Sequence, residues 1–104
     1  MIELNEKIFE EEIKKYKLIL VDFWAPWCIP CKLLEPTLVI LENDICIGKV
    51  NIDKDIELAK KFYIRSVPTL IIFNNGKIVQ RYIGVQHVST IKGFISSFEK
   101  HKNN

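Results

Sequence analysis

The chain has 104 residues, of which 48% are hydrophobic, and its formal net charge is +2 at pH 7. A chain of this length predicts one domain, residues 1–104, that is large enough to bury a core. The near balance of charges gives no case for a nucleic acid partner, and the apolar content argues against a disordered chain. Asp22 interrupts the longest apolar run, so the sequence predicts no membrane span.

Hydrophobic periodicity divides the chain into alternating strands and helices, followed by a hairpin. The turn Asn74-Asn75-Gly76 indicates the hairpin, because Asn and Gly accept the positive φ that tight turns need. In chain order we expect a strand at Ile2–Leu4, a helix through Lys15, a buried strand at Leu18–Phe23, a helix at Lys32–Leu41, a strand at Ile45–Ile52, a short helix carrying Leu58, Ala59 and Phe62, strands at Thr69–Phe73 and Lys77–Ile83, and a last helix carrying Ile91, Phe94, Ile95 and Phe98.

Short polar side chains are expected to cap three of the helices. Asn5, Asp55 and Ser89 precede the first, third and last helix, where they can accept hydrogen bonds from free N–H groups. Pro36 lies inside the second helix and is expected to kink it, since apolar residues continue beyond it. Residues from His101 onward are expected to form a frayed tail. The order of elements predicts a mixed sheet with helices on both faces.

Two cysteines follow the first long strand. Cys28 and Cys31 are three residues apart at the predicted start of a helix, so their sulfurs face the same way and can close a small disulfide ring. Unpaired N–H groups at a helix N-terminus favour the thiolate of Cys28. Pro30 is tolerated in the first turn because its missing N–H would have no partner there. This arrangement predicts a redox-active pair.

The run W-A-P-W-C-I-P-C-K, from Trp24 to Lys32, resembles the active-site motif of the thioredoxin family. The similarity covers essentially the whole chain, and Ile29 is the departure, since thioredoxins usually have glycine between the cysteines. The resemblance implies an α/β thioredoxin fold, with a mixed central sheet of about five strands flanked by four helices. Further matches are N-I-D at Asn51 to Asp53, V-P-T at Val67 to Thr69, F-N-N-G at Phe73 to Gly76, and Gly84.

The same resemblance implies a dithiol–disulfide oxidoreductase that reduces protein disulfides. Cys28 would attack a substrate disulfide, and Cys31 would then attack Cys28 to release the reduced product. No bound cofactor is expected, because the cysteines carry the electrons. The implied partners are disulfide-containing proteins and a thioredoxin reductase or related dithiol donor, and a monomer is the default.

The expected location is the cytoplasm. The first residues, M-I-E-L-N-E-K, lack the basic and then apolar layout of a signal peptide. In a reducing compartment a C-x-x-C motif is more often catalytic or metal-binding than a structural bridge.

Asp22 is the candidate proton acceptor. A carboxylate in a buried strand is costly when ionised, so burial should raise its pKa. Such an acid could take the proton from Cys31, through a water, as that thiol becomes the attacking group. The resemblance places the residue matching Asp22 behind the cysteine pair, with a lysine matching Lys49 close by. The alternative is an exposed acid at a strand edge.

An apolar rim around Cys28 would bind loosely held protein segments. The resemblance implies a cis peptide bond at Val67–Pro68, whose backbone would pair with an extended substrate, whereas an ordinary trans proline is the alternative. Trp24 is interpreted as a core residue that supports the site. The expected rim comprises Trp27, Ile29, Pro30, Val67, Pro68, Gly84 and Val85.

Other interpretations remain open from the sequence. A zinc or iron–sulfur site would need more ligands, and Cys46, His87 and His101 lack ligand spacing, so no metal is expected. Cys46 is interpreted as a small buried hydrophobe. An oxidant or isomerase of the same fold and a non-catalytic binding module are the alternative functions. Ile29 bears on this choice, because the residues between the cysteines tune the balance between thiolate and disulfide.

Overall fold

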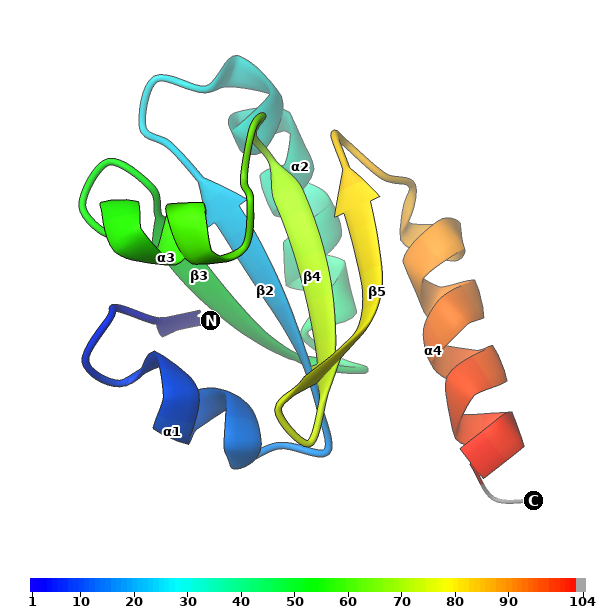
Figure 1. Cartoon of the computed structure of the whole chain (residues 1–104). Coiled ribbons are helices and arrows are strands. Elements are labelled where there is room, and N and C mark those ends of the chain that lie inside the picture. The colour runs from blue at the N-terminus through cyan, green and yellow to red at the C-terminus, as the bar shows by residue number, and fades with distance from the viewer. Residues whose placement is uncertain (103–104) are drawn as a thin grey trace.

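The computed structural model describes residues 1–102, in which five strands form one mixed sheet and four helices pack around it (Figure 1). The expected fold class is therefore confirmed. The elements are β1 (Ile2–Glu3), α1 (Phe9–Lys14), β2 (Leu18–Trp24), α2 (Ile29–Leu41), β3 (Cys46–Asn51), α3 (Ile56–Lys61), β4 (Thr69–Asn74), β5 (Lys77–Ile83) and α4 (Val88–Lys102). No helix among these residues is long and apolar enough to cross a bilayer.

Strand β2 lies at the centre of the sheet, whose strand order is β1-β3-β2-β4-β5. It runs parallel to β3 and antiparallel to β4. In this register the last residue of β2, Trp24, lies opposite Asn51 at the end of β3, and Phe23 lies opposite Thr69 at the start of β4. The loops after β2 and β3 and the loop before β4 therefore leave the sheet at the same edge.

The two faces of the sheet bury two separate apolar clusters. Alternation along β2 directs Ile19, Val21 and Phe23 to the face that α1 and α3 cover. Leu20 points to the opposite face, which α2 and α4 cover, and Asp22 follows it by two residues and shares that face. The helices contribute Phe9, Ile13 and Leu58 to the first cluster, and Leu34, Leu38, Leu41, Ile91 and Ile95 to the second. The layered arrangement is visible in Figure 1.

The predicted caps are found only in part, and the N-cap residue of α1 is Ile8 rather than Asn5. Asn5 accepts hydrogen bonds from the backbone N–H groups of Lys7 and Ile8, at 2.9 and 3.1 Å, in the turn that precedes α1. Asp55 occupies the N-cap position of α3 but forms no cap hydrogen bond. The prediction for Ser89 is also wrong, because α4 begins one residue earlier and Ser89 lies in its first turn.

A residue from another element replaces the missing cap of α3. The N–H of Glu57 donates to Oε1 of Glu6 at 3.2 Å, and Asp55 instead accepts from the N–H of Glu6 at 3.3 Å. This exchange ties the loop before α1 to the start of α3. It joins residues about fifty positions apart, which is why the local sequence pattern does not indicate it.

The start of α2, the end of α4 and the hairpin turn test three further predictions from the sequence. Helix α2 begins at Ile29, earlier than expected, and continues through Pro36. Helix α4 includes His101, whose Nδ1 lies 2.8 Å from the Ser97 carbonyl oxygen, so the expected frayed tail is wrong at this residue. Residues 103 and 104 of that tail lie outside the described residues. The hairpin turn is confirmed, with positive φ at Asn75 (49°) and Gly76 (85°).

The packing of α2 on the sheet can be tested with two neighbouring residues. Leu38 is fully buried, whereas Val39 is 57% exposed. Leu38→Ala is expected to lower the free energy of unfolding by about 2 to 5 kcal/mol, because it removes buried methyl groups and leaves a cavity. Urea denaturation measures the change. Val39→Ala is the control and should change it by less than about 0.5 kcal/mol; equal losses in both variants would contradict the arrangement.

Candidate active site

A disulfide joins Cys28 and Cys31 at the N-terminus of α2, with 5.3 Å between their Cα atoms. Cys28 is the N-cap residue, and its extended backbone (φ −90°, ψ 108°) lets its side chain turn back over the first turn. The backbone N–H of Cys31 donates to Sγ of Cys28 at 3.1 Å. Pro30 lies in the first turn, as predicted. An N–H group that points at this sulfur would stabilise negative charge on it.

A second loop faces the disulfide from the other side. The carbonyl oxygen of Val67 lies 3.5 Å from Sγ of Cys28, and the Val67–Pro68 peptide bond is cis, which confirms the expectation. The N–H of Gly84 donates to the Pro68 carbonyl at 2.8 Å, with a φ of 86° that glycine adopts freely. The Thr69 hydroxyl donates to the Ser66 carbonyl at 2.7 Å. The bond from Gly84 ties the loop before β4 to the end of β5, and the Val67 carbonyl places the same loop beside the Cys28 sulfur.

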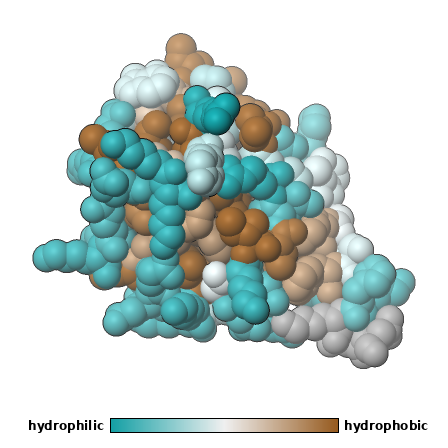
Figure 2. Space-filling model, viewed as in Figure 1, coloured by the Kyte–Doolittle hydropathy of each residue, from teal (hydrophilic) through white to brown (hydrophobic). Residues whose placement is uncertain are grey.

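Exposed apolar side chains surround the cysteines. Cys28 is only 3% exposed, whereas Trp27 and Ile29 beside it are 66% and 68% exposed. The indole N–H of Trp27 donates to Oδ1 of Asp53 at 3.3 Å, which holds the ring at the mouth of the site. Figure 2 shows apolar residues at the top of the molecule, over the loop between β2 and α2. Pro30 and Val85 are also exposed, Val67 and Gly84 are half-buried, and Pro68 is buried.

Asp22 lies fully inside the protein on the central strand. Its side chain is 0% exposed, and neither carboxyl oxygen has a hydrogen-bond partner among residues 1–102. Burial raises the pKa of this carboxyl from 3.8 to about 7, while the Lys49 ammonium lowers it and the Glu35 carboxylate raises it. The alternative of an exposed acid at a strand edge is therefore wrong. Asp22 can change its protonation state near neutral pH.

Lys49 lies beside Asp22 in the sheet but pairs with another acid. It is the β3 register partner of Asp22, and its ammonium forms an ion pair with the carboxylate of Glu35 on α2. The ammonium also lies 4.8 Å from the centre of the Trp24 ring. Sequence analysis missed Glu35. The available signal was its position four residues after Cys31, one turn further along the same helix.

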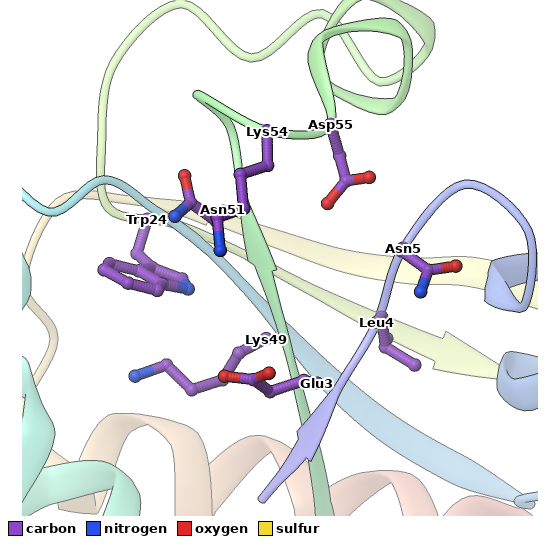
Figure 3. Close-up of a pocket in the computed structure, with 8 residues that line it drawn as sticks. All are labelled: Glu3, Leu4, Asn5, Trp24, Lys49, Asn51, Lys54 and Asp55. Atoms are coloured by element: carbon purple, nitrogen blue, oxygen red, sulfur yellow. The ribbon is translucent and has the colours of Figure 1, made fainter.

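Trp24 and Lys49 border a surface cavity of about 290 Å³ between β1 and the end of β3 (Figure 3). Trp24 is half-buried and packs against the cysteine cluster on one side, so it is only partly the core residue that was expected. In Figure 3 the Lys49 side chain extends past the Trp24 ring, away from the other residues of the cavity. The remaining lining residues are Glu3, Leu4, Asn5, Asn51, Lys54 and Asp55.

The third cysteine, Cys46, and the two histidines are the remaining side chains of the types that commonly bind zinc. In the part of the chain that the structure describes, no group of three or more His, Cys, Asp or Glu side chains could hold a metal ion. Cys46 is half-buried beside Tyr16 rather than fully buried, and partial burial raises the pKa of its thiol. His87 lies in the loop before α4.

Comparison with known proteins places this geometry in context. Residues 1–97 match the family model described as Thioredoxin. The chain is 39% identical over 100 residues to the thioredoxin of Buchnera aphidicola subsp. Acyrthosiphon pisum, covering 91% of this chain and 93% of that protein. It is 37% identical over 99 residues to the thioredoxin of Rickettsia bellii, with coverages of 90% and 94%. A mutant thioredoxin from Halobacterium salinarum has a TM-score of 0.86 at 29% identity, covering 92% of this chain and 88% of that one.

Sheet, helices and cysteine pair together define a dithiol–disulfide oxidoreductase. The chain belongs to the thioredoxin family. Thioredoxins need no cofactor beyond the redox-active disulfide, and as a family they act with a reductase and with disulfide-containing substrates.

The buried acid makes stability depend on pH in a defined direction. The pKa of Asp22 is about 7 in the folded protein and 3.8 when exposed, so between these values the folded state holds a proton that the unfolded state has lost. The free energy of unfolding therefore falls as pH rises through this window. Relative to Asp22→Asn, the protein should lose roughly 2 to 3 kcal/mol between pH 5 and pH 8.

Urea denaturation of the two proteins across this pH range measures the difference. The comparison cancels any cost of the introduced amide that does not depend on pH. Asp44→Asn is the matched control, because it replaces an acid whose side chain is 41% exposed and keeps Asp22. The difference in the free energy of unfolding between the protein and Asp44→Asn should therefore stay nearly constant from pH 5 to pH 8. A constant difference between the protein and Asp22→Asn at every pH would be inconsistent with a raised pKa.

Proposed function

We propose that the protein, acting as one domain over residues 1–104, reduces disulfide bonds of protein substrates in the cytoplasm. The observation that carries this proposal is the disulfide at the N-terminus of α2, where the Cys31 N–H donates to Sγ of Cys28. A donor aimed at this sulfur favours its thiolate, which is the form that attacks disulfides. A dithiol that acts as a reductant also needs a compartment that keeps thiols reduced, which supports the cytoplasm.

The first step transfers the substrate to Cys28. In the reduced protein the Cys28 thiolate attacks one sulfur of the substrate disulfide and forms a new S–S bond to it. The substrate S–S bond breaks, and its second sulfur leaves as a thiolate that takes a proton from water. The exposed side chains of Trp27 and Ile29 offer apolar contact to the substrate. The Val67 backbone, whose carbonyl faces Cys28, is placed to pair with an extended substrate segment.

The second step releases the substrate. Cys31 loses its proton to Asp22, directly or through a water, and the resulting thiolate attacks Sγ of Cys28. The Cys28–Cys31 disulfide forms, the mixed disulfide breaks, and the released substrate sulfur leaves as a thiolate that takes a proton from water. The substrate is then a dithiol with two more electrons than before. Asp22 suits this role because its pKa of about 7 lets it accept a proton near neutral pH. A thioredoxin reductase or related dithiol donor would then reduce the pair again.

Single cysteine variants test the order of attack. Incubated with a disulfide-linked protein such as insulin, Cys31→Ser should accumulate a stable mixed disulfide, because the attacking sulfur remains and the resolving sulfur is gone. Cys28→Ser should accumulate at least about tenfold less, since the backbone N–H donor of this site points at the sulfur of Cys28 and not at that of Cys31. Mass spectrometry under non-reducing conditions measures both adducts. Equal trapping by the two variants would contradict the assignment, and Cys46→Ser serves as the control that should retain full turnover.

The two kinetic steps separate the role of Asp22 from a general structural effect. Asp22→Asn should slow the release of the mixed disulfide about 10- to 100-fold at pH 7, because the proton acceptor for Cys31 is lost. The first attack, followed under stopped flow with a coloured aromatic disulfide, should change less than about threefold. If both steps slow by the same factor, Asp22 does not act as the acceptor in resolution.

A further inference from the structure

The Lys49 ammonium lies near two acids, Asp22 on β2 and Glu35 on α2, and forms its ion pair with Glu35. Lys49 is the register partner of Asp22, yet its ion pair and hydrogen bond are with Glu35 on α2. Both carboxyl oxygens of Asp22 are buried without a hydrogen-bond partner among residues 1–102. Lys49 thus pairs with Glu35 on the flank of the helix, and within residues 1–102 it forms no hydrogen bond with the buried carboxyl of Asp22.

Exposure explains why Glu35 can compete for the lysine. Asp22 is 0% exposed, whereas the side chains of Lys49 and Glu35 are 18% and 40% exposed. Moving the ammonium inward to a buried carboxylate would remove water from both charges, and that cost offsets much of the attraction between them. At the flank of α2 the ammonium keeps part of its hydration and gains a carboxylate partner. A carboxylate at position 35 therefore favours the outer placement.

We propose that Glu35 is a positioning residue for the disulfide chemistry: it holds the Lys49 ammonium on the flank of α2, so that Asp22 serves the cysteine pair without a direct counter-ion. This inference rests on the proposed role of Asp22 as the acceptor of the Cys31 proton. Glu35 acts through Lys49 rather than on the sulfur atoms.

The charges predict the direction of the effect. Burial raises the pKa of Asp22 most, the Lys49 ammonium opposes that rise, and the Glu35 carboxylate adds to it. Glu35→Gln removes one raising influence and also frees Lys49 to approach Asp22. Both changes lower the pKa of Asp22 from about 7. An acceptor with a lower pKa is a weaker base toward the proton of Cys31.

Other charged groups near Lys49 supply a matched control. Glu3 on β1, together with Lys54 and Asp55, lines the same cavity as Lys49 (Figure 3). Glu3→Gln removes an acid from this cavity and keeps the ion pair of Lys49 with Glu35. On the other side of Asp22, its register partner on β4 is the apolar Leu70.

The test follows the Asp22 carboxyl carbon by ¹³C NMR during a pH titration of the oxidised protein. In Glu35→Gln the midpoint should fall by about 0.5 to 1 pH unit relative to the unaltered protein, whereas Glu3→Gln should move it by less than about 0.2. In a Lys49→Gln background, where the intermediary is gone, Glu35→Gln should move the midpoint less than half as far. The proposal would be overturned by any of three results. The Asp22 midpoint could stay unchanged in Glu35→Gln, it could fall equally in Glu3→Gln, or Glu35→Gln could lower it by the full amount in the Lys49→Gln background.

A kinetic readout connects the titration to the reaction. The rate of mixed disulfide release should rise with pH as Asp22 loses its proton. In Glu35→Gln the midpoint of this rise should move to lower pH by the same amount as the NMR midpoint, and the plateau of the rate above pH 8 should fall about two- to fivefold. An identical pH profile in both proteins would count against a positioning role. The NMR titration needs no turnover, so failure of the unaltered protein to reduce insulin would reject the proposed function while the midpoints still decide the proposal for Glu35.

Discussion

The site depends on the register of the central strand. Because β2 is parallel to β3 and antiparallel to β4, its end meets the end of one neighbour and the start of the other. That edge receives the loop that carries Cys28 and the loop that carries Val67, whose carbonyl oxygen lies 3.5 Å from the Cys28 sulfur. The same register places Lys49 beside Asp22. A slip of one residue would turn Asp22 to the other face of the sheet, away from the face that α2 covers.

The buried carboxyl connects stability to chemistry. Asp22 lies on the central strand with no hydrogen-bond partner in the described part of the chain, which is unfavourable for a core, and its ionisation at neutral pH costs stability. The same burial brings the pKa of Asp22 to about 7, where a group can both accept and return a proton. Sequence rules for a good core fail at this position as they do at functional sites, which supports the proposed role of Asp22 in the reaction.

Local patterns predicted the fold and much of the site, whereas contacts between distant elements were not predictable. The spacing of the cysteines and the apolar run around Asp22 are each contained within one element, and both predictions are confirmed in geometry. The pair of Glu35 with Lys49 depends on how α2 rotates over β3, which no short pattern encodes. The same reason explains the wrong cap at Asp55, because Glu6 from another element supplies that hydrogen bond.

The reduction potential of the Cys28–Cys31 pair tests the central claim most directly. Ile29 stands between the cysteines where the family usually has glycine, so the potential also reports whether this side chain alters the redox balance. The measurement equilibrates the protein with defined ratios of reduced and oxidised dithiothreitol and traps the free thiols. A protein-disulfide reductase should give a value near about −270 mV, as thioredoxins do. A value above roughly −200 mV would contradict the account and indicate an oxidant or isomerase.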